Sequence, residues 1–295
     1  MKIKDTFGDR AFTVFCYVVV ILVAFICLYP LWLVLIYSVS DPDAVNAGQV
    51  WLWPVGVTWD AYKEVFARED LMKGYWNTIT QTLFGTAVNM TMTIPAAYAL
   101  SKSKLKGRGF FMGLIVFTMY FSGGLIPNFI NLKNLGLLNT WWVFGLCGAV
   151  SSYNLIVART FFVSGIPHEL EEAAEIDGCS VAGTFFKIVL PLSKAMLGVI
   201  MLYYVVGHWN NFSTALYYTP QSTEYWPLQM VIRNMIRTLN QMIGTADEEA
   251  LMYYTRIYDM IKYAVVVVAA LPVLVLYPFL QKYFNKGVML GSVKG

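Results

Sequence analysis

The stretch Glu169–Pro191, ELEEAAEIDGCSVAGTFFKIVLP, decides how the rest of this 295-residue chain is interpreted. Pro167 at a first helical position, followed by acidic residues, predicts a helix start, because acids complement the positive end of the helix dipole. We expect Gly178 to end that helix, and Ser180 to cap a second short helix that runs to Leu190–Pro191. The predicted structure is therefore a helix, a glycine corner and a second helix.

Five acidic residues lie between Glu169 and Asp177. An anionic lipid surface attracts lysine and arginine and disfavours such a cluster, whereas a groove on a protein partner can accept it. The alternative is a solvated acidic hairpin without a partner. The charge pattern thus favours a protruding loop that binds another protein.

The spacing within this stretch resembles the EAA loop of ABC importer permeases, EAA-x3-G-x9-I-x-LP, and every position of that pattern is filled. The matching residues are Glu172, Ala173, Ala174, Gly178, Ile188, Leu190 and Pro191. The resemblance implies that these residues, within a cytoplasmic EAA loop at 167–191, couple the chain to a separate ATPase subunit.

Composition places the chain among multispan membrane proteins. Hydrophobic residues make up 58% and charged residues 13%, and the mean hydropathy is +0.56. Six uncharged runs each reach or approach the roughly 20 residues that a helix needs to cross a hydrocarbon core of about 30 Å. These runs cover residues 11–40, 74–101, 109–132, 134–158, 195–223 and 263–281. Because an isolated span satisfies its backbone only as a helix, we predict an all-α membrane protein with six transmembrane helices.

The distribution of basic residues predicts the orientation. With the N-terminus inside, 13 of the 21 lysines and arginines lie in inner segments, most densely from Lys102 to Arg108. This bias favours an N-in, C-in topology. The net charge of +3 is then a signal of topology, and it does not suggest a nucleic-acid partner.

Further strings carry the same resemblance. Residues 95–101 (PAAYALS) are similar to the family at the end of the second span, and the glycines and proline at 121–127 (FSGGLIP) predict a helix break. Residues 123–142 are similar to permeases for complex oligosaccharides. The chain thus resembles the carbohydrate-uptake permeases of the maltose-transporter type, in particular their second permease.

That resemblance implies the type I ABC importer permease fold. Residues 1–73 would form an N-terminal tail, the first transmembrane helix and an outer loop. Residues 74–284 would form the permease core, and residues 285–295 a cytoplasmic tail. In the maltose-type permease the tail inserts between the ATPase subunits, which implies a contact through Gly291, Val293, Lys294 and Gly295. The alternative is a disordered tail.

The fifth span carries polar side chains at membrane depth, where they are costly against lipid and should face the bundle or a wet cavity. His208 taken alone is typical of a satisfied structural histidine. Aromatic faces and amides together suit a sugar, through stacking and hydrogen bonds to hydroxyls. The residues predicted to line a translocation cavity are Tyr204, His208, Trp209, Asn210 and Asn211.

The sequence lacks the motifs that nucleotide binding, metal binding and proton coupling require. No G-x-x-x-x-G-K-[ST] phosphate loop, no metal-ligand spacing and no paired acids within the spans occur. We therefore expect a non-catalytic chain without a cofactor, energised by ATP that partner subunits use. A stand-alone secondary transporter or channel is the alternative, but it would need an internal repeat or intramembrane charge.

The resemblance also implies the partners and the location. These are a second permease subunit, a cytoplasmic ABC ATPase dimer, an extracytoplasmic solute-binding protein, membrane lipid and a sugar substrate, at the prokaryotic cytoplasmic membrane. The predicted function is that of a permease subunit that translocates a sugar, and the predicted sugar is an oligosaccharide.

Overall fold

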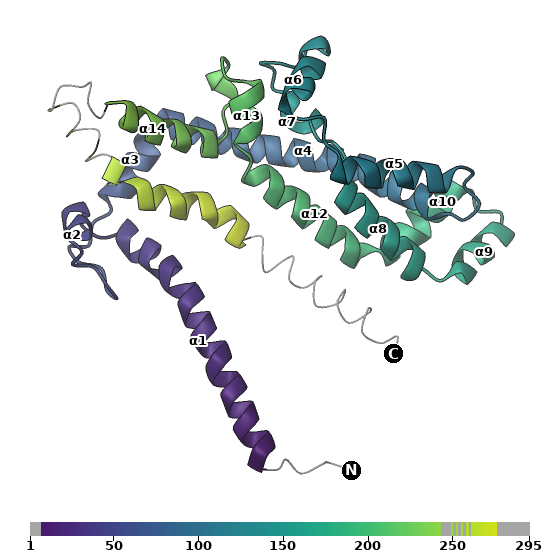
Figure 1. The fold of residues 1–295 in the computed structure, drawn as a ribbon, viewed down its shortest axis with the longest axis horizontal. Coiled ribbons are helices and arrows are strands. Elements are labelled where there is room, and N and C mark those ends of the chain that lie inside the picture. The colour runs from purple at the N-terminus through teal and green to yellow at the C-terminus, as the bar shows by residue number, and fades with distance from the viewer. Residues whose placement is uncertain are drawn as a thin grey trace. The chain divides into compact units, whose positions relative to one another are not determined.

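The structure is a computed structural model that describes residues 7–242, 249, 252, 255, 258, 259 and 261–275. Every regular element in these residues is a helix, as the sequence predicted (Figure 1). The longer helices are α1 (Phe7–Ser38), α4 (Glu69–Ser101), α5 (Arg108–Tyr120), α6 (Leu125–Asn134), α8 (Ser152–Ser164), α9 (His168–Ile176), α12 (Lys194–Trp209), α14 (Leu228–Met242) and Ile261–Val275. The shorter ones are α2 (Pro42–Asn46), α3 (Asp60–Ala67), α7 (Val143–Leu146), α10 (Val181–Thr184), the π-helical turn Phe185–Val189, α11 (Leu190–Leu192), α13 (Ser213–Tyr218) and the 3-10 turn Thr223–Tyr225.

The chain divides into two compact units. The first is formed by the described residues of Met1–Glu69 and Met235–Leu271, and the second by those of Asp70–Asn234 and Pro272–Gly295.

The first unit is built on α1. Its 32 residues give a helix about 48 Å long, which exceeds a hydrocarbon core of about 30 Å. The loop that follows folds back along the helix, since Tyr29 and Trp32 donate hydrogen bonds to the carbonyl oxygens of Trp51 and Leu52, at 3.4 and 3.0 Å. The first predicted span is therefore one unbroken helix with an ordered aromatic loop at its C-terminal end.

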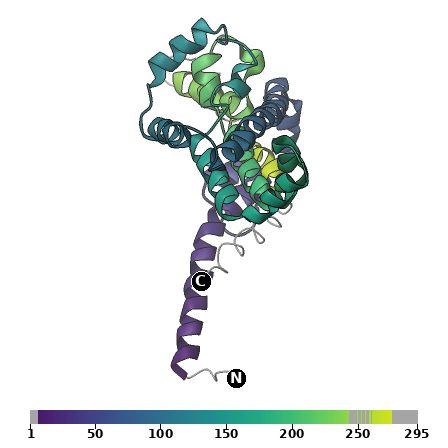
Figure 2. The same ribbon diagram turned by 90° about the vertical axis from the view of Figure 1, so that its right-hand side faces the viewer.

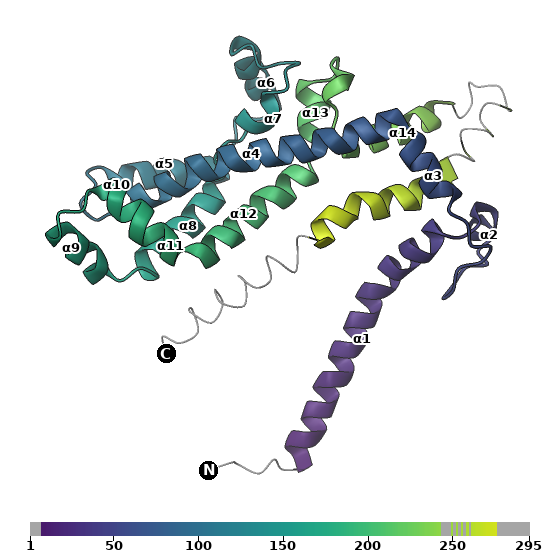
Figure 3. The ribbon, with the colours of Figure 1, turned by 180° about the vertical axis from the view of Figure 1, so that it is seen from behind.

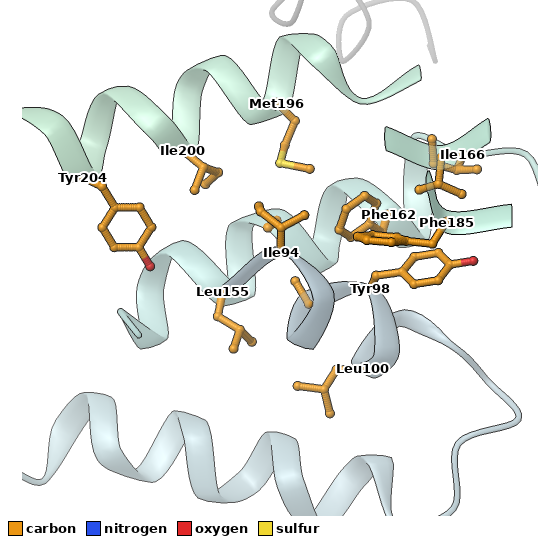
Figure 4. Packing of buried hydrophobic residues seen from close by; sticks show 13 residues of the cluster. Ile94, Tyr98, Leu100, Leu155, Phe162, Ile166, Phe185, Met196, Ile200 and Tyr204 are labelled. Atoms are coloured by element: carbon orange, nitrogen blue, oxygen red, sulfur yellow. The ribbon is translucent and has the colours of Figure 1, made fainter. Parts of the chain in front are cut away.

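The second unit is a bundle in which α4, α5, α8 and α12 run side by side (Figures 1 and 3), and Figure 2 shows this group nearly end-on. Its interior is an apolar cluster drawn from α4, α8, α12 and the EAA loop (Figure 4). The buried members are Ile94, Ala97, Tyr98, Leu100, Leu155, Ala158, Phe162, Ile166, Phe185, Val189, Met196, Ile200 and Tyr204. Burial of these side chains fixes α4, α8 and α12 against one another and against the loop.

The predicted helix break at residues 121–127 is confirmed. Helix α5 ends at Tyr120, α6 begins at Leu125, and the two axes differ by 117°. Gly124 lies between them with φ +86°, a backbone conformation that glycine adopts without steric cost. Pro127 sits in the first turn of α6, where its missing N–H leaves no helical hydrogen bond unmade.

The predicted fourth span, residues 134–158, is not one helix. Helix α7 covers Val143–Leu146, α8 begins only at Ser152, and residues 147–151 between them are not helical. Irregular backbone is tolerated at membrane depth only where other groups satisfy it. The side-chain amide nitrogen of Asn89 donates hydrogen bonds to the carbonyl oxygens of Gly148 (3.2 Å) and Ala149 (2.8 Å), so these two backbone groups have partners.

Tyr204 completes the arrangement from α12. Its hydroxyl oxygen accepts a hydrogen bond from the backbone N–H of Ser151 (3.1 Å) and is hydrogen-bonded to the Thr93 hydroxyl (2.6 Å). His208 Nε2 lies 2.5 Å from Asn89 Oδ1. We call this set, Asn89, Thr93, Ser151, Tyr204 and His208, the polar seam.

Asn89 and Thr93 of the polar seam belong to a longer buried polar face of α4. One face of this 33-residue helix is polar and buried, with Thr78, Gln81, Thr82, Thr86, Asn89 and Thr93 each at most 5% exposed. By length and composition, only α1 among the described helices qualifies as a span by itself, and the count rises to three if each bent helix pair forms one span. The count of six and the N-in, C-in orientation stay predictions.

We expect Asn89→Leu to destabilise the protein by on the order of 2–4 kcal/mol, because it leaves two backbone carbonyls and His208 without their partner. Thermal unfolding of the purified detergent-solubilised transporter measures this. The control is Thr91→Ala, on the exposed face of α4, whose hydroxyl bonds only to carbonyls of its own helix. Equal melting temperatures for the two variants would contradict this account of the seam.

Candidate ATPase-coupling site

The predicted glycine corner is present in the EAA loop. Helix α9 begins at His168, one residue after the predicted start, because Pro167 has an extended ψ of 132°. Gly178 has φ +74°, its N–H bonds to the Glu175 carbonyl (3.1 Å), and the Cys179 N–H bonds to the Ala174 carbonyl (2.9 Å). These two bonds form a Schellman motif, which closes a helix by a residue in the left-handed conformation.

The second half of the loop is also as predicted. Ser180 caps α10, since its Oγ accepts a hydrogen bond from the Gly183 N–H at 3.1 Å. The helix continues through a π-helical turn, where the Leu190 N–H bonds to the Phe185 carbonyl. Pro191 has no N–H to donate to the turn before it, which favours this wider turn. The segment Val181–Leu192 then meets α12 at a bend of 83°.

The motif residues divide between the interior and the surface. Ala174 is buried, and Ile188 and Leu190 are half-buried, so these apolar side chains hold the loop against the bundle. The other motif residues, Glu172, Ala173, Gly178 and Pro191, are exposed. In Figures 1 and 3 α9 extends beyond the ends of α4 and α5, so Glu172 and Ala173, which lie on α9, belong to a protruding element.

Two lysines fasten the loop to the end of α4. Lys102 forms an ion pair with Glu171, and its Nζ lies 3.9 Å from the centre of the Tyr98 ring. The Tyr98 ring packs in turn on Phe185 of the loop, with ring centres 4.8 Å apart. Because the Lys102 and Glu171 side chains are only 25% and 17% exposed, solvent screens this pair weakly.

Lys104 makes the second contact, and Glu175 Oε2 lies 2.9 Å from its Nζ. The hydrogen bond and the charge of Glu175 raise the pKa of the Lys104 ammonium. Both side chains are largely exposed, so this pair contributes less to holding the loop than the pair of Lys102.

The two pairs separate the acids of the loop into two groups. Glu171 and Glu175 bind lysines of the same chain, whereas Glu169, Glu172 and Asp177 form no ion pair with the described residues. The motif carboxylate, Glu172, is therefore available to a partner.

Sequence reasoning missed two exposed apolar residues on either side of the corner. Ile176 is 86% exposed and Val181 is 74% exposed. Both flank a glycine corner within an otherwise acidic loop, and that contrast was the available signal. Exposed apolar side chains beside unpaired carboxylates are typical of a protein-binding surface.

The structure disperses the residues predicted to line a cavity. Tyr204 and His208 belong to the polar seam, and Trp209 is buried with its ring 6.0 Å from that of Tyr75. Asn211 is half-buried, and its side chain donates to the Thr214 hydroxyl and accepts from the Thr214 N–H in the first turn of α13. Asn210 is exposed, with its side chain bonded to its own helix. Cavity lining stays a prediction for these residues.

The residues predicted to contact the ATPase from the tail, Gly291, Val293, Lys294 and Gly295, lie outside the described residues. Among the described residues, no cluster of metal-ligating side chains is present.

An acid-rich helix–glycine–helix loop with the EAA spacing, held against a helical bundle, is the arrangement expected of a permease subunit of an ATP-binding-cassette importer. Residues 71–290 match the family of binding-protein-dependent transport system inner membrane components, and the chain belongs to this family. It is thus a non-catalytic subunit, whose ATP is hydrolysed by a separate ATPase, and not a stand-alone transporter.

Known relatives cover nearly the whole chain. The polygalacturonan/rhamnogalacturonan transport system permease protein YtcP of Bacillus subtilis is 41% identical, over 97% of this chain and 99% of its own. Protein LplC of the same organism is 43% identical, over 83% of this chain and 81% of its own.

A solved structure shows the same fold. It is a chain of a bacterial ABC transporter involved in the import of the acidic polysaccharide alginate, with a TM-score of 0.85 and 32% identity. The alignment covers 96% of this chain and all of that one. The type I ABC permease fold implied by the sequence is thereby confirmed.

We expect Gly178→Val to abolish most transport, because a β-branched residue resists the left-handed conformation, at a cost of about 1–2 kcal/mol or more. Uptake by the reconstituted transporter measures this. Gly178→Asn should retain more activity, since asparagine tolerates this conformation. The matched control is Gly109→Val, at a glycine with ordinary φ and no atom within 4 Å of an added Cβ. Normal transport by Gly178→Val would refute the corner's role.

We expect Lys102→Glu and Glu171→Lys each to weaken retention of the ATPase on the purified transporter, because each places two like charges in a poorly solvated position. The double variant should recover part of the loss. Lys104→Glu should have a smaller effect, because its pair with Glu175 is exposed. If the double variant were no better than the single ones, the pair would not hold the loop.

Proposed function

We propose that this chain is one of two membrane subunits in an ATP-driven importer of oligosaccharides at the prokaryotic cytoplasmic membrane. It would cross the membrane six times with both ends inside, and would work with a second permease, two ATPase subunits and an extracytoplasmic solute-binding protein. No cofactor would be bound by this chain itself. Its family membership supports the partnership with other ABC components.

The EAA loop carries this proposal. Its corner presents the unpaired Glu172 together with Ile176 and Val181, while the opposite side is fastened to α4 by Lys102. An element that is firmly held on one side and exposed on the other can pass a movement from a partner to the bundle. The movement requires only that the loop contact the ATPase differently in its two states.

The cargo is proposed to be an oligosaccharide that contains uronic acid units. YtcP is named for polygalacturonan and rhamnogalacturonan transport, and the structural neighbour takes part in the import of alginate. Galacturonan and alginate are both polymers of uronic acids. The terminal residues Gly291, Val293, Lys294 and Gly295 are proposed as a further contact with the ATPase.

Reconstitution tests the proposed function. The chain is placed in proteoliposomes with its partner permease, the ATPase and the cognate solute-binding protein, and uptake of labelled oligogalacturonides is measured. We expect uptake only when ATP, the ATPase and the binding protein are all present. Uptake that needs neither the ATPase nor ATP and follows an ion gradient would contradict the proposal. A panel with neutral oligosaccharides tests the choice of cargo separately.

A further inference from the structure

Helix α12 has two faces that differ in their surroundings. Met196, Ile200 and Tyr204 follow one another at every fourth residue and point into the core of the bundle (Figure 4). Tyr203, Gly207 and Asn210 have spacings of four and three, which place them together on another face. All three of these residues are exposed.

A second tyrosine, from α8, joins this exposed face. The ring centres of Tyr153 and Tyr203 are 6.4 Å apart, with their planes at 48°. The side chains remain 53% and 43% exposed, and within the described part of the chain neither hydroxyl has a hydrogen-bond partner. Tyr204, the next residue along the chain, has both its partners in the polar seam. The two adjacent tyrosines thus have opposite environments.

The open tyrosines lie at similar depth in the proposed membrane. Tyr203 is nine residues from Lys194 at the start of α12, which is about 13 Å along the helix. Tyr153 is eleven residues from the end of α8 at Ser164, about 16 Å. If both of those ends face the cytoplasm with the EAA loop, the two rings lie near the middle of a core about 30 Å thick.

The face of α12 that carries Tyr203, Gly207 and Asn210 is unfavourable in contact with lipid. A hydroxyl without a partner costs free energy in hydrocarbon, and tyrosines that face lipid are enriched at the membrane interfaces and not at the centre. Gly207 adds open space between Tyr203 and Asn210, since a Cβ built on it would meet no atom within 4 Å. Tyr203, Gly207 and Asn210 therefore form a strip about 10 Å long along α12, beside Tyr153 of α8, and its hydroxyls and amide favour a polar, hydrated neighbour.

We propose that Tyr153, Tyr203, Gly207 and Asn210, the tyrosine strip, form a sugar-binding surface of the translocation path. This rests on the proposed function of oligosaccharide import. Sugar rings present an apolar face that stacks on aromatic rings, and hydroxyls that bond to phenol and amide groups. The strip carries no charge, so it recognises ring faces and hydroxyls, which neutral and acidic sugars share, and it leaves recognition of a carboxylate to other parts of the transporter.

The test uses the complete transporter in proteoliposomes, with ATP inside and the sugar-loaded binding protein outside. Oligogalacturonides and maltooligosaccharides are the probes. Tyr203→Ala and Tyr153→Ala should each lower the kcat/KM of uptake about tenfold or more, which corresponds to one stacked and hydrogen-bonded group. Tyr203→Phe should fall between Tyr203→Ala and the unaltered protein, because it keeps the ring and loses the hydroxyl. The control is Met201→Ala, which is 45% exposed on α12 but faces away from Tyr203, and which should leave uptake unchanged.

A second measurement detects contact directly. A photoreactive phenylalanine analogue at position 203 should cross-link to labelled sugar in the ATP-bound transporter, and the same analogue at position 201 should not. Cross-linking of position 203 to the second permease instead, or loss of that subunit from the purified Tyr203→Ala complex, would show a subunit contact and overturn the proposal. Uptake by Tyr203→Ala equal to that of Met201→Ala would overturn it as well. Failure of the unaltered transporter to use ATP for uptake would instead overturn the proposed function.

Discussion

The second unit depends on hydrogen bonds between side chains and the backbone groups of a non-helical segment. A chain that crosses hydrocarbon cannot leave its N–H and C=O groups without partners, and residues 147–151 are not helical. Asn89 and Tyr204 supply the partners from two other helices, which fixes where α4, α8 and α12 lie. Gly85 permits the close approach, because a Cβ there would come within 2.4–2.8 Å of the His208 ring.

The same helix α4 that supplies Asn89 also holds the coupling loop. Its last turns carry Tyr98, which packs on Phe185, and Lys102 follows directly and pairs with Glu171. Loop and polar seam are thus attached to one helix, in which Pro95 lies between Asn89 and Tyr98 and removes one hydrogen bond of the helix. We infer that this shared helix links the loop to Asn89 and, through Asn89, to the non-helical segment that precedes α8.

Local signals in the sequence were sufficient for the loop and insufficient for the bundle. The corner at Gly178 and the cap at Ser180 each depend on residues within one helical turn, and both were predicted correctly. The pairing of Lys102 with Glu171 joins residues 69 positions apart, so the basic cluster was interpreted only as a signal of topology. The broken fourth span did have a local signal in Gly148 and Ser151, which a criterion of uncharged runs overlooks.

The prediction of the cavity residues was limited because it did not consider which face of the helix each residue occupies. It grouped Tyr204, His208 and Asn210 as polar side chains at membrane depth in one span, without regard to the helix face, but a helix separates adjacent residues by about 100°. Positions 204 and 208 therefore share the inward face, and positions 203, 207 and 210 share the open one. This division has a mechanical consequence: the face that stabilises the fold and the proposed sugar-binding face are parts of one rigid helix. A displacement of α4 that moves Asn89 and Thr93 would act on both faces of α12 together, because Tyr204 and His208 bind those two residues.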